Sequence, residues 1–119
     1  MNREQRYALA NRALEEGIED NSEGKVILVE GKRDEIALRK LGFIGPIEKL
    51  NRCWTVDRVV VYIVEEYGSC IVLMDWDRTG GRLQKRLMDS MTSLDIKPCD
   101  ELRRALSKAM KPDTMCVDC

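Results

Sequence analysis

Two acidic motifs, each placed directly after an apolar run, are the residues of this chain whose types and spacing could do chemistry. The run IVLM is followed by Asp75, Trp76 and Asp77, and the run VILV is followed by Glu30 and Gly31. Short apolar runs of this kind are typical of buried strands. If the IVLM strand continues through its motif, the side-chain period of two places Asp75 and Asp77 on one face, with Trp76 turned away.

Carboxylates gathered in this way are suited to binding a hard cation. Ligands of parallel sheets bind beyond the carboxyl ends of the strands, and if the two strands are neighbours, Glu30 comes close to Asp75 and Asp77. Three carboxylates at one edge repel one another, and their desolvation is unfavourable unless a cation offsets it. Their oxygens suit Mg²⁺ or Mn²⁺ better than a metal that prefers thiolates. The spacing therefore predicts a metal site made of these three acids.

Glycines and basic residues accompany the acids at the predicted starts of two helices. Backbone N–H groups at a helix start attract phosphate, and glycine lets a ligand approach the backbone closely. We therefore expect a phosphate- or nucleic-acid-binding set made of Gly31, Lys32, Arg78, Gly80, Arg82 and Arg86. Each acidic motif alone is also common at an ordinary strand end, and a basic stripe alone is typical of a solvated helix face. Their joint occurrence is what indicates a functional site.

The elements that must position these residues alternate along the chain. Hydrophobic periodicity predicts helices over residues 3–19, 32–42, 55–68, 79–94 and 99–110. Apolar or β-branched runs predict strands over residues 25–31, 43–51, 71–74 and 114–118. In the second helix we expect Ile36 and Leu41 to face inward and Gly42 to end the helix. Strands alternating with helices predict an α/β domain with a mainly parallel sheet.

The segment TVDRVVVYIVEEYG supports two interpretations. Its density of β-branched residues favours a strand. Its apolar residues, however, recur at helical spacing, while Thr55 is a suitable N-cap and Gly68 a suitable stop. At 14 residues the segment is also long for one strand, so we predict a helix.

Composition and charge limit the class of protein. The chain has 119 residues, of which 44% are hydrophobic and 34% charged, as is typical of one globular domain spanning residues 1–119. Its formal net charge of −1 argues against coating nucleic acid by bulk charge. A nucleic-acid partner would therefore need a local basic patch or a metal. We expect no membrane segment and no signal peptide, and hence a cytoplasmic location.

The five cysteines are Cys53, Cys70, Cys99, Cys116 and Cys119. An odd number in a chain without a secretion signal predicts reduced thiols. Cys116 and Cys119 have the spacing of a metal knuckle or of a redox pair. A structural zinc site needs about four ligands, however, and the chain has no histidine, so we favour two ordinary cysteines near a strand end.

Taken together, the two acidic motifs resemble those of the Toprim domain, which topoisomerases, bacterial primases and several nucleases share. VILVEGKRDEIALRKLG resembles the first motif, in which an apolar strand is followed by Glu30 and Gly31, with Asp34 as an acid that supports the helix. IVLMDWDRTGGRL resembles the second motif, in which D-x-D follows an apolar strand and a glycine opens the helix. The motifs lie about 45 residues apart, and the resemblance covers residues 24–118.

The resemblance implies a three-layer α/β fold with a mainly parallel four-stranded sheet between helices. In that fold the glutamate strand lies next to the D-x-D strand, and residues 1–22 of this chain would add an extra N-terminal helix. The implied activity is Mg²⁺-dependent phosphodiester chemistry on nucleic acid, with a nuclease favoured over a synthetic enzyme. A larger protein complex is a possible context for a chain of this size.

The resemblance also implies roles for single residues. Glu30 would be the general acid/base or a metal ligand. Asp75 and Asp77 would bind Mg²⁺, which would stabilise charge on the attacking and leaving oxygens of a phosphodiester. Arg78 and Arg82 would contact backbone phosphates.

Two other functions are consistent with the same residues. A non-catalytic nucleic-acid-binding module of a larger complex suits the small size and near-neutral charge. A phosphatase of the haloacid dehalogenase kind is suggested because DWDRTGG resembles D-x-D-x-T, with Asp75 as covalent nucleophile and Asp77 as acid/base. That family needs a lysine and an acidic pair on later strands, and only 42 residues follow Asp77. The choice between DNA and RNA, and the oligomeric state, stay open.

Overall fold

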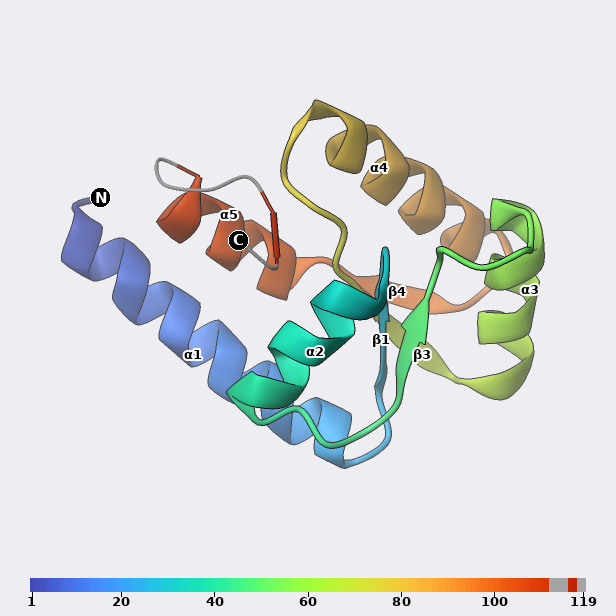
Figure 1. The fold of residues 1–119 in the computed structure, drawn as a ribbon, viewed down its shortest axis with the longest axis horizontal. Coiled ribbons are helices and arrows are strands. Elements are labelled where there is room, and N and C mark those ends of the chain that lie inside the picture. The colour runs from blue at the N-terminus through green and yellow to red at the C-terminus, as the bar shows by residue number, and fades with distance from the viewer. Residues whose placement is uncertain (112–115, 118–119) are drawn as a thin grey trace.

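Helices and strands alternate along residues 1–111 and 116–117, which are the part of the chain that this computed structural model describes (Figure 1). In chain order the elements are α1 (Arg3–Ser22), β1 (Val26–Val29), α2 (Lys32–Leu41), β2 (Ile47–Lys49), α3 (Val56–Glu66), β3 (Ser69–Val72), α4 (Arg78–Ser93), β4 (Lys97–Cys99) and α5 (Glu101–Met110). None of the helices within the described residues has the length and apolar character needed to span a membrane.

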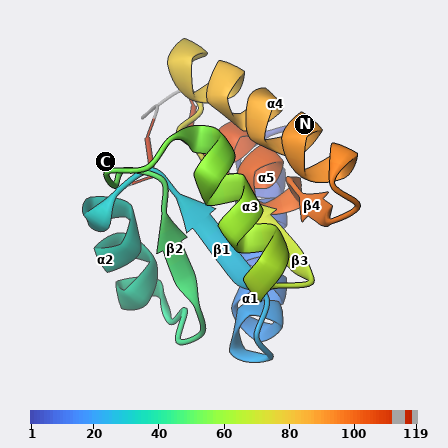
Figure 2. The ribbon, with the colours of Figure 1, turned by 90° about the vertical axis from the view of Figure 1, so that its right-hand side faces the viewer.

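The four strands form one parallel sheet in the order β2-β1-β3-β4 (Figure 2). β1 and β3 are neighbours at its centre, where Leu28 pairs with Val72. All four residues of β1 are buried, because the strand is covered on both faces, and this explains its continuous apolar run. The expected adjacency of the glutamate strand and the D-x-D strand is confirmed.

Helices cover both faces of the sheet and make three layers (Figure 1). On one face, Val26 and Leu28 of β1 join a core with α3 and α4. On the other face, Ile27 and Val29 join a core with α1, α2 and α5, and α1 packs along α5. The predicted α/β class, with a four-stranded parallel sheet flanked by helices, is confirmed.

The segment with two interpretations is the helix α3, as its periodicity predicts. Thr55 caps it, because its side chain accepts a hydrogen bond from the N–H of Arg58 at 3.2 Å. Val59 and Ile63 are buried in the core beside the sheet, and the helix ends at Glu66. Its β-branched residues therefore pack against the sheet instead of pairing within it.

The inward face of α2 differs from the prediction. Ile36 and Leu41 are 45% and 53% exposed, whereas Asp34 and Leu38 are buried. Ile36 is two residues from Leu38, or about 200° around the helix, so the two side chains cannot face the sheet together. Leu41 is the last helical residue, before Gly42, whose φ of 109° ends the helix as predicted.

The fourth strand of the sheet is β4, not the predicted strand over residues 114–118. That prediction is wrong for the two residues of the segment that the structure describes. Cys116 and Val117 do not form a strand, and the rest of that segment lies outside the described residues. β4 pairs with β3 at the edge of the sheet. Its three residues include Pro98 and the exposed Lys97, so it shows no apolar run. Proline is tolerated because the strand is at an edge.

β3 ends before the D-x-D motif. Its last residue is Val72, although the N–H of Leu73 still donates a hydrogen bond to the carbonyl of Leu28 at 2.9 Å. Asp75 and Asp77 therefore belong to the connection between β3 and α4. The placement of both aspartates on one face required the strand to continue that far, and this condition is not met.

Candidate functional site

Glu30 connects the carboxyl ends of the two central strands. It follows β1 directly, is half-buried, and accepts a hydrogen bond on Oε1 from the backbone N–H of Asp75 at 3.2 Å. The two residues are far apart in the chain and meet because β1 and β3 are neighbours. The structure therefore brings together the first acid of each motif.

Arg103 on α5, a residue that no sequence motif marks, holds the segment that carries Asp75. Its Nε donates to the carbonyl of Met74 at 3.1 Å, and its Nη2 donates to the carbonyl of Asp75 at 2.9 Å. The carboxylate Oδ1 of Asp75 accepts a hydrogen bond from the N–H of Val117 at 3.0 Å. Arg103 is followed by a second arginine, and only the packing of α5 decides which of the two faces the site.

Asp77 is exposed and caps α4, because its Oδ1 accepts a hydrogen bond from the N–H of Gly80 at 2.7 Å. A Cβ at Gly80 would lie 2.0 Å from the carbonyl oxygen of Asp75, so this position accepts only glycine. The N–H of Gly81 donates to the carbonyl of Asp77 at 2.9 Å. Both glycine N–H groups at this helix start are thus engaged within the chain and are not directed at a ligand.

Gly31 opens α2, and Asp34 supports the same helix start. The Asp34 side chain is buried, and its Oδ2 accepts a hydrogen bond from the N–H of Gly31 at 3.0 Å. A carboxylate here also interacts favourably with the helix dipole. Lys32 follows on the exposed side. The fixed position of Asp34 places a second negative charge near Glu30.

The charges at this edge act on one another. Burial raises the pKa of Glu30 above its ordinary value, and the negative charges of Asp75, Asp34 and Asp77 raise it further, against the hydrogen bond from the Asp75 N–H. Burial lowers the pKa of Arg103, which nearby carboxylates oppose, and the guanidinium stays charged at neutral pH. The edge thus combines mutually repelling carboxylates with a nearby cation.

Two cavities open at this edge. The first has a volume of about 580 Å³ and is lined by Glu30, Gly31, Lys32, Arg33, Asp34, Leu50, Asn51, Asp75 and Leu83. The second has a volume of about 370 Å³ and is lined by Trp76, Asp77, Arg78, Gly81, Arg103, Ser107 and Lys111. The first is lined by three acidic and two basic side chains, and the second by one acidic and three basic side chains.

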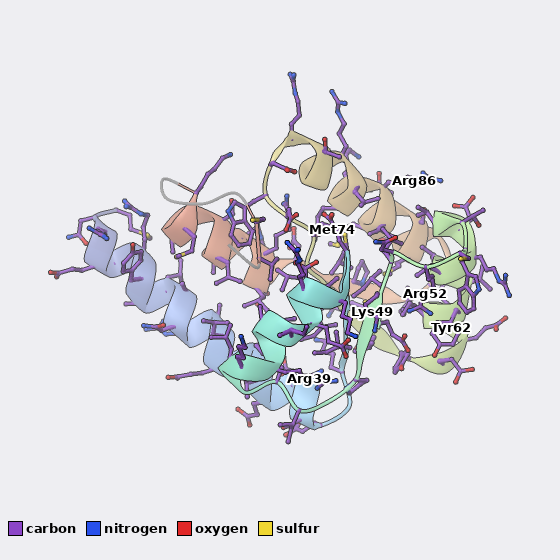
Figure 3. All side chains as sticks on the ribbon, in the orientation of Figure 1. Arg39, Lys49, Arg52, Tyr62, Met74 and Arg86 are labelled. Carbon is purple, nitrogen blue, oxygen red and sulfur yellow. The ribbon has the colours of Figure 1, made fainter. Side chains whose placement is uncertain are left out.

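The predicted basic set is divided among different places. Lys32 lines the first cavity and Arg78 the second. Arg82 is exposed on α4. Arg86, labelled on α4 in Figure 3, forms an ion pair with Asp57 of α3 at 3.6 Å. The helical stripe of arginines therefore leads away from the acids toward α3.

Gln84, which the sequence did not single out, completes the backbone hydrogen bonding beyond β3. It is buried, accepts a hydrogen bond from the N–H of Met74 at 3.1 Å and donates to the carbonyl of Val72 at 2.8 Å. The sequence does contain a signal for this role, because Gln84 is a polar residue on the same helix face as the apolar Leu87 and Met91. Its two bonds fix α4 to the strand that leads to Asp75.

The donor set at the edge suits Mg²⁺, although the described residues contain no group of three acids, cysteines or histidines placed to hold a metal. Glu30 Oε1, Asp75 Oδ1 and Asp77 Oδ1 each accept a backbone N–H, and a carboxylate has a second oxygen with which to bind a cation. Mg²⁺ keeps several waters and needs only one or two carboxylates, a number that Glu30 and Asp75 could supply. A site that uses all three acids stays a prediction.

The cysteines differ in state. Cys53, Cys70 and Cys99 are free thiols, with Cys70 buried. Cys116 is disulfide-bonded, so the expectation of reduced thiols is wrong for this residue. The prediction of a reduced thiol at Cys119 lies outside the described residues.

Fold and site together define a parallel α/β protein whose acids gather at the carboxyl ends of its two central strands. No family model matches the chain. A UPF0292 protein from Pyrococcus furiosus is 42% identical over 89 residues, which are 72% of this chain and 66% of that protein. One from Thermococcus sibiricus is 37% identical over 108 residues, which are 90% of this chain and 84% of that protein. The chain belongs to the UPF0292 family.

These relatives come from archaea, and their names state no activity. The match spans slightly less than two thirds of the length of the Pyrococcus furiosus protein. A solved structure, titled a putative protein from Aquifex aeolicus, shares the fold with a TM-score of 0.74 at 24% identity. The similarity covers 91% of this chain and 94% of that one.

Proposed function

We propose that the chain is an enzyme that cleaves phosphodiester bonds of nucleic acid with Mg²⁺ or Mn²⁺, on a Toprim-type domain in the cytoplasm. The observation that carries this proposal is the hydrogen bond between Glu30 and the backbone of Asp75 at the ends of neighbouring strands. Two acids from motifs far apart in the chain thereby line one cavity that is open to solvent. The resemblance of both motifs to Toprim sequences supports the same assignment.

Three acids have roles in this proposal. Glu30 and Asp75 would hold the metal from the first cavity, and Asp77 would add a third carboxylate if its cap on α4 opened. A bound Mg²⁺ would supply positive charge that stabilises the negative charge developing on the phosphoryl oxygens. In the metal-free protein Glu30 is the acid whose environment favours the protonated form, as a general acid requires.

Basic residues beside the acids would position the phosphate. Arg78, Arg103 and Lys111 line the second cavity together with Asp77. Arginine binds phosphate through two parallel hydrogen bonds, which fixes orientation as well as charge. Arg103 is already held by two backbone carbonyls, so it is the cation with the most defined position at the site.

The test is cleavage of labelled single- and double-stranded DNA and RNA with Mg²⁺, with Mn²⁺ and with EDTA. Asp75→Asn, Asp77→Asn and Glu30→Gln should each lower metal-dependent cleavage by about 100-fold or more, because each removes a charge or proton donor from the reaction. Asp89→Asn is the matched control, since Asp89 is an exposed acid of α4 that pairs with Lys85. Circular dichroism checks folding. Wild-type cleavage by both aspartate variants would refute the assignment.

A non-catalytic binding module is the second candidate, and one observation favours it. The three carboxylates already accept backbone N–H groups, which is typical of structural acids at strand ends and helix caps. Tight binding of nucleic acid in EDTA, without turnover in Mg²⁺ or Mn²⁺, would decide for the module. Trapping a phosphoaspartate at Asp75 with beryllofluoride would instead indicate a phosphatase.

A further inference from the structure

Trp54 lies on the loop between β2 and α3 and carries two arginines over its ring. The guanidinium carbon of Arg52 is 4.9 Å from the ring centroid, and that of Arg58 is 4.3 Å away. The ring of Tyr62 packs edge-on against Trp54, with the centroids 5.5 Å apart. Figure 3 shows Arg52 and Tyr62 next to each other beside α3. Cations over an indole face are attracted by its quadrupole.

The two arginines are held very differently. Arg52 is half-buried, forms an ion pair with Glu48 at 2.9 Å and donates to the carbonyl of Lys49 at 2.6 Å. Arg58 is exposed, and among the described residues it forms no ion pair. Arg52 alone already ties the loop that carries Trp54 to β2, through Glu48 and Lys49. The second cation is therefore not explained by the need to hold the loop.

We propose that Trp54 and Arg58 form a stacking site for an unpaired base of single-stranded nucleic acid, in which the base replaces the exposed Arg58 guanidinium over the indole ring and Arg58 turns to the phosphate. Aromatic rings and guanidinium planes both stack on bases, and an arginine without an acid partner can also bind the adjoining phosphate. Base stacking does not depend on bulk positive charge, which suits a chain with a net charge of −1. This inference rests on the proposed function for its ligand class.

The position of the loop connects this stacking site with the acidic cavity. Asn51 lines that cavity and donates its N–H to the carbonyl of Glu30 at 2.7 Å. Trp54 is three residues further along, so the two backbone positions are at most about 11 Å apart. This separation is short enough for one strand of several nucleotides to reach both Trp54 and the cavity. A base offers its face only when it is unpaired, so the substrate is single-stranded.

The experiment measures binding of labelled oligothymidylate, about 15 nucleotides long, by fluorescence anisotropy in EDTA. Trp54→Ala should weaken binding about tenfold, because stacking on one base is lost. Arg58→Gln should lower the slope of log affinity against log salt by about one, because one phosphate contact is lost. The duplex form of the same oligonucleotide should bind more weakly than the single strand.

Two further variants keep the test independent of folding. Trp54→Phe retains a stacking ring, so it should bind within about threefold of wild type, but it should lack the quenching of Trp54 fluorescence that we expect when wild type binds. Trp76, which lines the second cavity, remains in this variant, so the difference between the fluorescence changes of the two proteins reports Trp54. Tyr7→Ala is the matched control, since it breaks another arginine–aromatic contact, that of Arg3 at 5.2 Å on α1, and should leave binding unchanged.

The outcomes separate this inference from the proposed function. Trp54-dependent binding in EDTA by a protein that cleaves nothing in Mg²⁺ or Mn²⁺ would support the stacking site and refute the enzyme. Metal-dependent cleavage, with Trp54→Ala and Arg58→Gln binding the oligonucleotide as wild type does, would support the enzyme and refute the stacking site. Equal affinity for duplex and single strand would also refute the stacking site.

Discussion

Glu30, which directly follows β1, and Glu48 on the neighbouring strand β2 are carboxylates in opposite surroundings. Glu48 accepts hydrogen bonds from the guanidinium of Arg52 at 2.9 Å and from the hydroxyls of Tyr62 and Tyr67, both at 2.8 Å. Burial raises its pKa, but these three donors outweigh burial and lower the pKa below the ordinary value. At Glu30, burial and three nearby acids raise the pKa, and a backbone N–H opposes them.

The difference separates a structural acid from an acid that is available for function. Glu48 has its charge offset by donors of its own chain, so it binds β2 to α3 and has little left to offer a ligand. Glu30 lies among acids, and a cation or a proton would relieve the repulsion. Perturbed carboxylates of the second kind are typical of functional sites. The comparison therefore assigns structure to the Glu48 cluster and supports the proposal that the Glu30 edge binds a ligand.

Gly80→Ala should have the largest effect on stability, because the acidic edge depends on close backbone packing. The added Cβ would lie 2.0 Å from the carbonyl of Asp75, and backbone cannot move aside as a side chain can. We expect a loss of about 3 kcal/mol in the free energy of unfolding, measured with urea. Gly81→Ala is the control, since its Cβ would be 3.7 Å from the nearest side-chain atom and should change stability by about 1 kcal/mol at most. Similar losses in both variants would contradict this description.

Removing the charge from each glutamate tests the comparison directly. Glu48→Gln should lower the free energy of unfolding by about 2 kcal/mol, because charged acceptors make stronger hydrogen bonds than amides. Glu30→Gln should change it by no more than about 0.5 kcal/mol, because lost repulsion offsets the weaker bond to the Asp75 N–H. Both are read from urea unfolding at neutral pH. If Glu30→Gln proves the more damaging, the assignment of structure to one cluster and binding to the other is reversed.

The fold could be predicted where one local signal dominates. Continuous apolar runs identify β1 and β3. In α3, the helical spacing of the apolar residues and the N-cap Thr55 outweigh the β-branched composition. The inward face of α2 could not be predicted, because its buried position next to Leu38 is the polar Asp34, which hydrophobic periodicity passes over. β4 is short, lies at an edge and pairs through its backbone, so its side chains carry little signal.

Of the candidate site, only the contacts that follow from the order of the strands could be predicted. Parallel neighbours place Glu30 beside Asp75, and this followed from the two apolar runs. The capping role of Asp77 had a local signal, since aspartate is a preferred N-cap, but the D-x-D spacing favoured a metal ligand instead. The contacts of Arg103 depend on how α5 packs beside β3, and no pattern within the helix reveals that.

The pH dependence of stability gives the smallest expected effect and distinguishes the two glutamates by sign. The folded pKa of Glu30 lies above its ordinary value of 4.5, so its unfavourable charge is relieved as the pH falls from neutral through that raised pKa. Wild type should therefore gain stability relative to Glu30→Gln on the way down to 4.5. The folded pKa of Glu48 lies below 4.5, so its stabilisation persists over that range and is lost only at more acidic pH. Wild type should then lose its advantage over Glu48→Gln. Urea midpoints of wild type, Glu30→Gln and Glu48→Gln, measured against pH, should show the gain from Glu30 above pH 4.5 and the loss from Glu48 below it. If both changes occur over the same pH range, the two carboxylates are in equivalent surroundings.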